Sequence, residues 1–170
     1  MATADTNVNE NGYSFTARKS LLVSSRGAPI TASPDTGLLA NVLERNITFT
    51  ASVVGTVGTT ALANVTGVVA LDVFGVCSST LQGVDGLIRV GTNLVPAGLI
   101  ADTVATGIDI NEIWHDASPD ASIEATSIVG KNIVTEDIIY TIGSTAISDG
   151  AIDFYIVWSP ISDDGDVKAP

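Results

Sequence analysis

Apolar and polar residues alternate in short runs along most of this chain, which is the pattern of half-buried β-strands. In Ile47–Val53 every second residue is apolar, and Thr or Ser fills the positions between. Tyr13 and Phe15 alternate with hydroxyl residues in a shorter run, and Asp85–Gly91 repeats the pattern. We therefore predict a strand at each of these three places.

A longer run, Val68–Val76, is apolar on both faces apart from Asp72. Such a run is typical of a central strand that is covered on both sides. Cys77 follows directly and is the only cysteine of the chain. A single cysteine excludes an internal disulfide framework. We predict that Cys77 is a small core residue and not a nucleophile.

The clearest alternation lies in Ala151–Trp158, where every second residue is Ile, Phe or Trp. Pro160 lacks the amide that a sheet requires, so it should end this strand. Asp149-Gly150 stands directly before it and is typical of a tight hairpin turn. We therefore expect the strand to pair antiparallel with the preceding apolar run, Asn132–Ile142.

Only Gly37–Arg45 has helical spacing of its apolar residues, after Pro34 and a possible cap at Asp35 or Thr36. One short helix does not change the class. The turn-rich links between strands favour an all-β, single-domain β-sandwich or jelly roll with an N-terminal arm and at most one short helix. We divide the chain into an arm or first strands (1–30), the sandwich (31–161) and a polar C-terminal tail (162–170).

The alternating positions also predict the hydrophobic core. These residues should face inward from the predicted strands: Phe49, Val69, Leu71, Val73, Ile88, Val90, Ile138, Ile152, Phe154 and Ile156.

Charge is low in amount and uneven in distribution. Charged residues make up 15% of the 170 residues, against about 25% in an average protein. The surface must therefore be rich in Ser, Thr, Asn and Gly, which cost little to desolvate when proteins assemble. The net charge is −12, with 13 of the 19 acids after residue 100. Such a body would repel nucleic acid and anionic membranes, so we expect neither as a partner.

Two sorting signals are not expected. The N-terminal stretch has no basic segment followed by an apolar one, as a signal peptide requires. The chain has no run of 18 apolar residues, so we expect no membrane-spanning helix.

Candidate chemistry is sparse. His115 is the only histidine and stands between Glu112 and Asp116. A hydrolytic metal site normally takes three protein ligands, and no second histidine is present. In a strand, Glu112 and His115 would point to opposite faces, so a structural or surface role is favoured over catalysis.

Two other features, an acidic cluster and the aromatic residues, are candidates for binding sites. Asp163, Asp164 and Asp166 surround a glycine, but their spacing misses that of a calcium loop. Aromatic residues could line a sugar-binding face, yet they stand on strand patterns, which favours core or interface positions. These aromatic residues are Tyr13, Trp114, Tyr140, Tyr155 and Trp158.

The stretch Val84–Ile161 covers nearly half of the chain and resembles a known group as a whole. Its most informative parts are ATGIDINEIWHDASPDASIEA and DGAIDFYIVWSPIS. They are similar to small β-rich virion structural proteins of tailed bacteriophages, most of all to head decoration (cement) proteins. The N-terminal half of the chain carries little of this likeness, and the two strings contain no catalytic motif.

The resemblance implies a non-enzymatic structural protein without a cofactor, located on the capsid exterior of the virion. Its expected partners are the major capsid protein and further copies of itself, most often as a homotrimer. Two alternatives stay open. One is a tail, baseplate or fibre-adaptor structural protein, and the other is a carbohydrate-binding module.

The N-terminal arm, 1–30, is the predicted contact with the capsid. Tyr13 and Phe15 would be apolar anchors, because interface anchors are typically aromatic or Arg residues. Arg18, Lys19 and Arg26 would complement an acidic shell, and they are three of the seven bases. The alternative is that the run around Tyr13 is simply the first strand of the domain.

Overall fold

The computed structural model describes residues 41–120 and 132–170. These residues belong to one compact unit, Ala40–Pro170. The predictions for the arm at 1–30 therefore lie outside the described residues.

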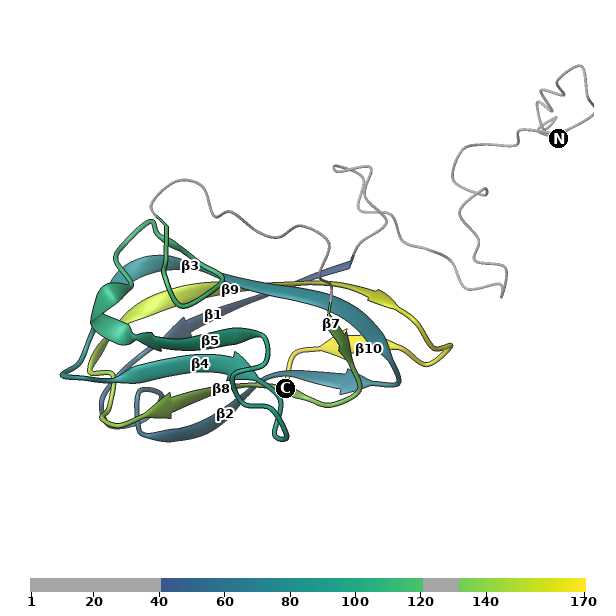
Figure 1. Ribbon diagram of the computed structural model, residues 1–170, viewed down its shortest axis with the longest axis horizontal. Helices are drawn as coiled ribbons and strands as arrows, with labels where there is room; N and C mark the ends of the chain where they lie inside the picture. Colours follow the sequence, from purple (N-terminus) through teal and green to yellow (C-terminus); the bar gives the residue numbers. More distant parts are fainter. Residues whose placement is uncertain (1–40, 121–131) are drawn as a thin grey trace, which may run out of the picture. The chain divides into compact units, whose positions relative to one another are not determined.

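The described chain is almost entirely β-structure (Figure 1). One 3-10 turn, η1, spans Ala105–Gly107. The strands are β1 (Asn41–Thr48), β2 (Gly58–Thr66), β3 (Val69–Gln82), β4 (Leu87–Gly91), β5 (Ile100–Val104), β6 (Ile113–Trp114), β7 (Asn132–Val134), β8 (Ile138–Gly143), β9 (Asp149–Pro160) and β10 (Asp166–Lys168).

The strands form two antiparallel sheets that lie as two layers in Figure 1. One sheet has the order β1-β9-β3-β6, with β7 also pairing with β3, and the other has the order β10-β2-β8-β4-β5. Thus β1 pairs with β9, β2 with β8, β3 with β6 and β7, and β4 with β5. This nested pairing is the arrangement of a jelly roll, in which a long hairpin is wound into two sheets. The predicted all-β fold is confirmed.

The nested order places the connections alternately at the two ends of the sandwich. We call the ends the cross-bonded end and the groove end. Figure 1 shows the cross-bonded end at the left and the groove end at the right. The cross-bonded end contains residues 49–57, 83–86, 105–112 and 144–148, and the groove end contains residues 67–68, 92–99 and 135–137.

The ladder between β3 and β9 is the longest strand pairing of the first sheet. It runs from Val69 opposite Pro160 to Gln82 opposite Asp149, with β1 on the other side of β9. Alternate residues of β9 are buried from Gly150 to Trp158, as the sequence predicted. Pro160 is the last residue of the strand, also as predicted.

The core lies between the two sheets and contains every residue predicted for it. All ten are at most 2% exposed. Trp114, Tyr140 and Phe154 fill the centre, where each ring packs within 6.5 Å of another, measured between ring centres. Burial of apolar area of this kind is the main favourable term in folding.

A buried hydrogen bond joins the two sheets. The indole Nε1 of Trp114, on β6, donates to the hydroxyl of Thr103, on β5, at 2.8 Å. The Thr103 hydroxyl also lies 3.1 Å from the carbonyl of Ala101 and 3.2 Å from that of Asp116. The polar atom of the largest core side chain is therefore satisfied without water.

The predicted helix at Gly37–Arg45 is wrong where the structure describes it. Asn41–Arg45 belongs to β1, which pairs with β9 along its whole length. Val42 is 60% exposed, so it does not belong to the apolar face that a helix would need. The continuous ladder outweighs the local helical spacing, because helix propensity differs little between ordinary residues. Residues 37–40 lie outside the described part.

The predicted hairpin around Asp149-Gly150 is also wrong. Asn132–Ile142 divides into β7, which pairs with β3, and β8, which pairs with β2 and β4. Neither pairs with β9. The intervening residues cross between the sheets, with Ile147 buried and its amide bonded to Gly55. Gly150 has a positive φ of 113°, but it lies at the beginning of β9 and not in a two-residue turn.

Two element boundaries differ as well. The strand predicted at Ile47–Val53 ends at Thr48, and the chain turns after Phe49, leaving Val53 70% exposed. Part of the predicted polar tail forms β10, which pairs with β2. Val167 is buried there, and one apolar side chain at the right register is enough to add a short edge strand.

Candidate functional site

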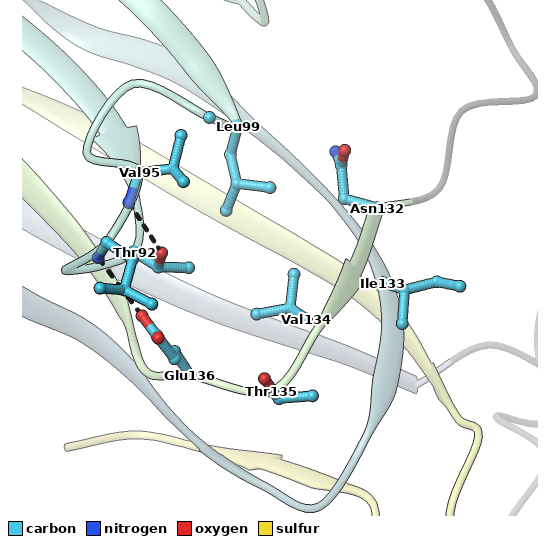
Figure 2. Close-up of a pocket in the computed structure, with 10 residues that line it drawn as sticks. Thr92, Val95, Leu99, Asn132, Ile133, Val134, Thr135 and Glu136 are labelled. Carbon is cyan, nitrogen blue, oxygen red and sulfur yellow. Dashed lines mark hydrogen bonds between the residues drawn. The ribbon is translucent and has the colours of Figure 1, made fainter.

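A hollow of the described surface lies at the groove end (Figure 2). It has a volume of about 280 Å³ and separates the β4–β5 connection from β7 and the residues that follow it. A shallower hollow of about 430 Å³ continues it towards Val65. The two share Leu94, Thr135 and Glu136, and we call them together the groove.

The β4–β5 connection is a tight loop held by its own hydrogen bonds. The amide of Thr92 donates to the Val95 carbonyl at 3.1 Å, and the Val95 amide donates to the Thr92 hydroxyl at 3.2 Å. Gly98 donates to the same carbonyl at 3.0 Å. The loop folds so closely over Gly91 that the Val95 carbonyl occupies the space a Cβ would need. The loop therefore presents a fixed wall to the groove.

The floor and rim of the groove are apolar. Leu99 and Val134 point towards each other across it in Figure 2, and both pack on the core. Leu94 and Val95 on the loop are 80% and 59% exposed, whereas the exposed side chain of Ile133 on β7 points away from the groove (Figure 2). Exposed aliphatic residues gathered at one place often mark a binding surface, whereas isolated ones do not.

Two carboxylates border the apolar floor. Glu136 accepts a long hydrogen bond, 3.4 Å, from the amide of Leu94, and Asp137 accepts one of 2.8 Å from the amide of Val65. The described lining residues include no lysine, arginine or histidine. The groove is therefore apolar at its base and negative at its rim.

The groove contains carboxylates but no other titratable side chain among its described lining residues. These carboxylates belong to Glu136 and Asp137. Leu99 and Val134 supply the apolar floor between them and the loop. This site was not predicted from the sequence. The one available signal was Leu94-Val95, two aliphatic residues in a turn-rich link.

His115 does not assemble a catalytic site with its acidic neighbours. Its Nε2 lies 3.2 Å from a carboxylate oxygen of Asp72 on β3. Glu112 faces elsewhere and accepts a 2.7 Å hydrogen bond from the amide of Asp109. The described residues contain no group of three or more His, Cys, Asp or Glu placed to hold a metal ion.

Cys77 is 1% exposed, which confirms it as a core residue. Burial raises the pKa of its thiol, and the carboxylates of Glu112 and Asp109 raise it further. A thiol with a raised pKa is a poor nucleophile at neutral pH. The arrangement thus fits a packing role.

The acidic residues near the C-terminus are used in local bonds. Asp164 accepts from the Ser162 hydroxyl at 2.7 Å, and that hydroxyl also accepts from the Val68 amide. Asp166 accepts from the amide of Val167 and pairs with Lys168. The bond between Ser162 and Val68 ties the residues after β9 to the β2–β3 turn, whereas the bonds of Asp166 stay within β10.

The aromatic residues that the structure describes do not form an open row. Trp114, Tyr140 and Trp158 are buried, and Tyr13 lies outside the described residues. Tyr155 stacks on Phe74 of the neighbouring strand, with ring centres 5.2 Å apart and planes 19° apart. The inner faces of these two rings cover each other. Partial desolvation, together with the nearby Glu44 and Asp153, raises the pKa of Tyr155.

No helix in the described residues is both long and apolar enough to cross a membrane.

The predicted contact residues, Tyr13, Phe15, Arg18, Lys19 and Arg26, all lie outside the described residues. Comparison of the chain with models of protein families, with curated proteins and with solved structures gives no match.

Proposed function

We propose that the protein is a non-enzymatic structural protein of a tailed-bacteriophage virion that decorates the head shell. It would bind the major capsid protein from the capsid exterior and stabilise the shell. The resemblance of Val84–Ile161 to virion proteins carries this proposal. The described part of that stretch supplies β4 to β9, which are strands of both sheets.

The jelly-roll arrangement supports the proposal by analogy only. Viral capsid domains and lectins both use this fold, and a fold by itself does not fix a function. A lectin-like role requires aromatic faces that are open to a sugar ring. Phe74 and Tyr155 stack on each other through one face of each ring, and the described residues show no row of such faces, so we keep the carbohydrate-binding module as the second alternative.

The distribution of charge supports contact through the N-terminal arm. Fifteen of the 19 acids but only three of the seven bases lie in the described residues. An acidic body is repelled by an acidic shell, whereas residues 1–30 carry Arg18, Lys19 and Arg26 against two acids. Several copies around a symmetry axis, most simply three, would present these contacts together.

The test is binding of the purified full chain to undecorated heads of its phage, followed by sedimentation. We expect saturable binding that weakens as salt is added, because salt screens the attraction between the arm and the shell. The double variant Arg18→Glu, Lys19→Glu should bind more weakly and lose less of its binding when salt is added. The matched control is Lys131→Glu, Lys168→Glu, which changes the net charge equally and should bind as the unmodified chain does.

Two outcomes would contradict the proposal. Attachment to tails and not to heads would favour the tail or baseplate alternative. Equal loss in both double variants would mean that net charge alone governs binding and that the N-terminal arm is not the contact. Sedimentation equilibrium separately checks the homotrimer, and a monomer at high concentration would exclude it.

A further inference from the structure

Among the described residues β7 pairs only with β3, so it is an edge strand there, and its outer side borders the groove. It pairs with β3 through Val134 opposite Val69, Ile133 opposite Ala70 and Asn132 opposite Leu71. The groove is lined by these same three residues of β7. The direction in which their N–H and C=O groups point therefore determines whether a segment bound in the groove can form main-chain hydrogen bonds with β7.

The hydrogen bonds of β3 fix that direction. Along an antiparallel strand, successive residues direct their N–H and C=O groups to opposite sides. The carbonyl of Val68 accepts from Ile161, just beyond β9, whereas the amide of Cys77 donates to Glu112, on the side of β6. The ladder between β3 and β9 has no register shift before Cys77. Odd-numbered residues of β3, including Val69 and Leu71, therefore face β7.

It follows that Asn132 and Val134 exchange hydrogen bonds with β3, and that Ile133 does not. The N–H and C=O of Ile133 point away from the sheet, towards the open side of β7. The Ile133 side chain also points away from the groove, whereas that of Val134 points into it (Figure 2). The edge thus offers one donor and one acceptor beside an apolar hollow.

We propose that this edge and the groove form a strand-addition site for an extended segment of a partner protein. The segment would pair with the N–H and C=O of Ile133. A neighbouring aliphatic side chain would enter the hollow beside Val134 and Leu99. Peptides that add to a sheet edge gain affinity from such main-chain bonds and specificity from alternate side chains.

Charge complementarity selects the segment. Glu136 and Asp137 border the hollow, the described lining residues carry no base, and the chain has a net charge of −12. The partner segment should therefore carry Lys or Arg next to its aliphatic residues. This inference does not depend on the proposed function, because it concerns a different surface.

Binding of a labelled peptide, SGLVLKKGS, to the full chain tests the proposal by fluorescence anisotropy. Ile133→Pro removes the outward N–H and keeps both residues that bond to β3, and proline is tolerated at such edge positions. Ile133→Thr keeps the N–H and changes only a side chain that points away. We expect Ile133→Pro to weaken binding at least about fivefold and Ile133→Thr to leave it unchanged.

Side-chain contacts are tested by Leu94→Ser and Glu136→Gln, which should also weaken binding. Val84→Ser is the matched control, because Val84 is 79% exposed and Leu94 80%, and Val84 lies at the cross-bonded end. A peptide with Glu in place of both Lys should bind less well than SGLVLKKGS. N-methylation of the Val amide in SGLVLKKGS should abolish binding. This peptide tests main-chain pairing even if Ile133→Pro does not fold.

The proposal is overturned if Ile133→Pro and Ile133→Thr bind equally, if Val84→Ser weakens binding as much as Leu94→Ser does, or if the acidic or methylated peptide binds as tightly. Dissociation constants above about 1 mM for every peptide would also overturn it. Self-association of the free protein that Ile133→Pro abolishes would assign the edge to a second copy instead.

Discussion

The two ends of the sandwich differ in how far their connecting residues bond to one another, although the Leu94 amide at the groove end also bonds to Glu136. At the cross-bonded end, the connections bond to one another or to the strands beside them: Ile147 donates to Gly55, Ser148 to Gln82 and Ala105 to Gly86. At the groove end, the β4–β5 loop bonds mainly within itself, from Thr92 to Gly98.

This difference separates connections that hold one another in place from a loop that leaves apolar side chains exposed. Mutual bonds and the burial of Ile147 hold the loops of the cross-bonded end against one another. A loop that satisfies its own backbone can stand apart from its neighbours, and it leaves apolar side chains such as Leu94 open to a partner. Substitutions in the packed interior should therefore cost folding energy, and those in the groove should not.

The largest effect is expected for Phe154→Ala in the centre of the core. Phe154 is fully buried and contacts the rings of Trp114 and Tyr140. Its loss should lower the free energy of unfolding by about 3–5 kcal/mol, measured by urea titration. Tyr155→Ala, one residue away on the outer face, should cost clearly less. A cost below about 1 kcal/mol for Phe154→Ala would contradict the packing described.

Thr103→Val tests the interior further, because it removes a hydrogen bond between the two sheets. The Trp114 Nε1–H would lose its acceptor while it stays buried. The expected loss is about 1–3 kcal/mol, measured by urea titration. Thr135→Val, an exposed position in the groove, is the matched control and should change stability by less than about 0.5 kcal/mol. Similar losses of unfolding free energy at both sites would contradict the view that the interior contributes to stability and the groove does not.

Alkaline pH should act on two buried side chains of the interior, Tyr140 and Cys77. Burial raises the pKa of Tyr140 above its ordinary 10.0 and that of Cys77 above its ordinary 9.0. The unfolded chain therefore releases these protons first, and the free energy of unfolding falls as the pH rises through these values. This contribution is fully present below pH 9.

Tyr140→Phe tests that cause. The Tyr140 hydroxyl is buried and makes no hydrogen bond with a described residue. The substitution should hardly change stability at pH 7, and it should reduce the alkaline loss seen in urea titrations between pH 8 and about 11. An unchanged alkaline loss in Tyr140→Phe would mean that other groups cause it.

The smallest effect is expected at the groove end. Leu94→Ala removes a side chain that is 80% exposed, so the free energy of unfolding should change by less than about 0.5 kcal/mol. A larger loss in urea titration would show that Leu94 supports the loop and would count against a binding surface.

Sequence reasoning identified the strands where one local rule was sufficient. In β9 the alternation of Ile152, Phe154 and Ile156 predicted the buried face, and in β3 the apolar run after Val68 predicted a central strand. Both signals are local: the alternation in β9 is the two-residue period of a half-buried strand, and the apolar run in β3, interrupted only by Asp72, is typical of a central strand.

The groove could not be found in this way. Leu94 belongs to one connection, whereas Val134 and Glu136 belong to a distant segment of the chain, and no local pattern links the two. The outward direction of the Ile133 backbone depends on the register between β7 and β3. Such a register is a property of a pair of strands.

The sequence by itself thus determined the all-β class, the ten core residues and the end of β9 at Pro160. Only the tertiary structure decided which strands pair. The Asp149-Gly150 turn signal was overruled because β8 and β9 belong to different sheets, and the helical spacing at 37–45 was overruled at Asn41–Arg45 by the ladder with β9. The reason is physical: which face of a strand is buried is set by neighbouring residues, whereas pairing is set by contacts between distant segments, whose combined energy exceeds any local preference.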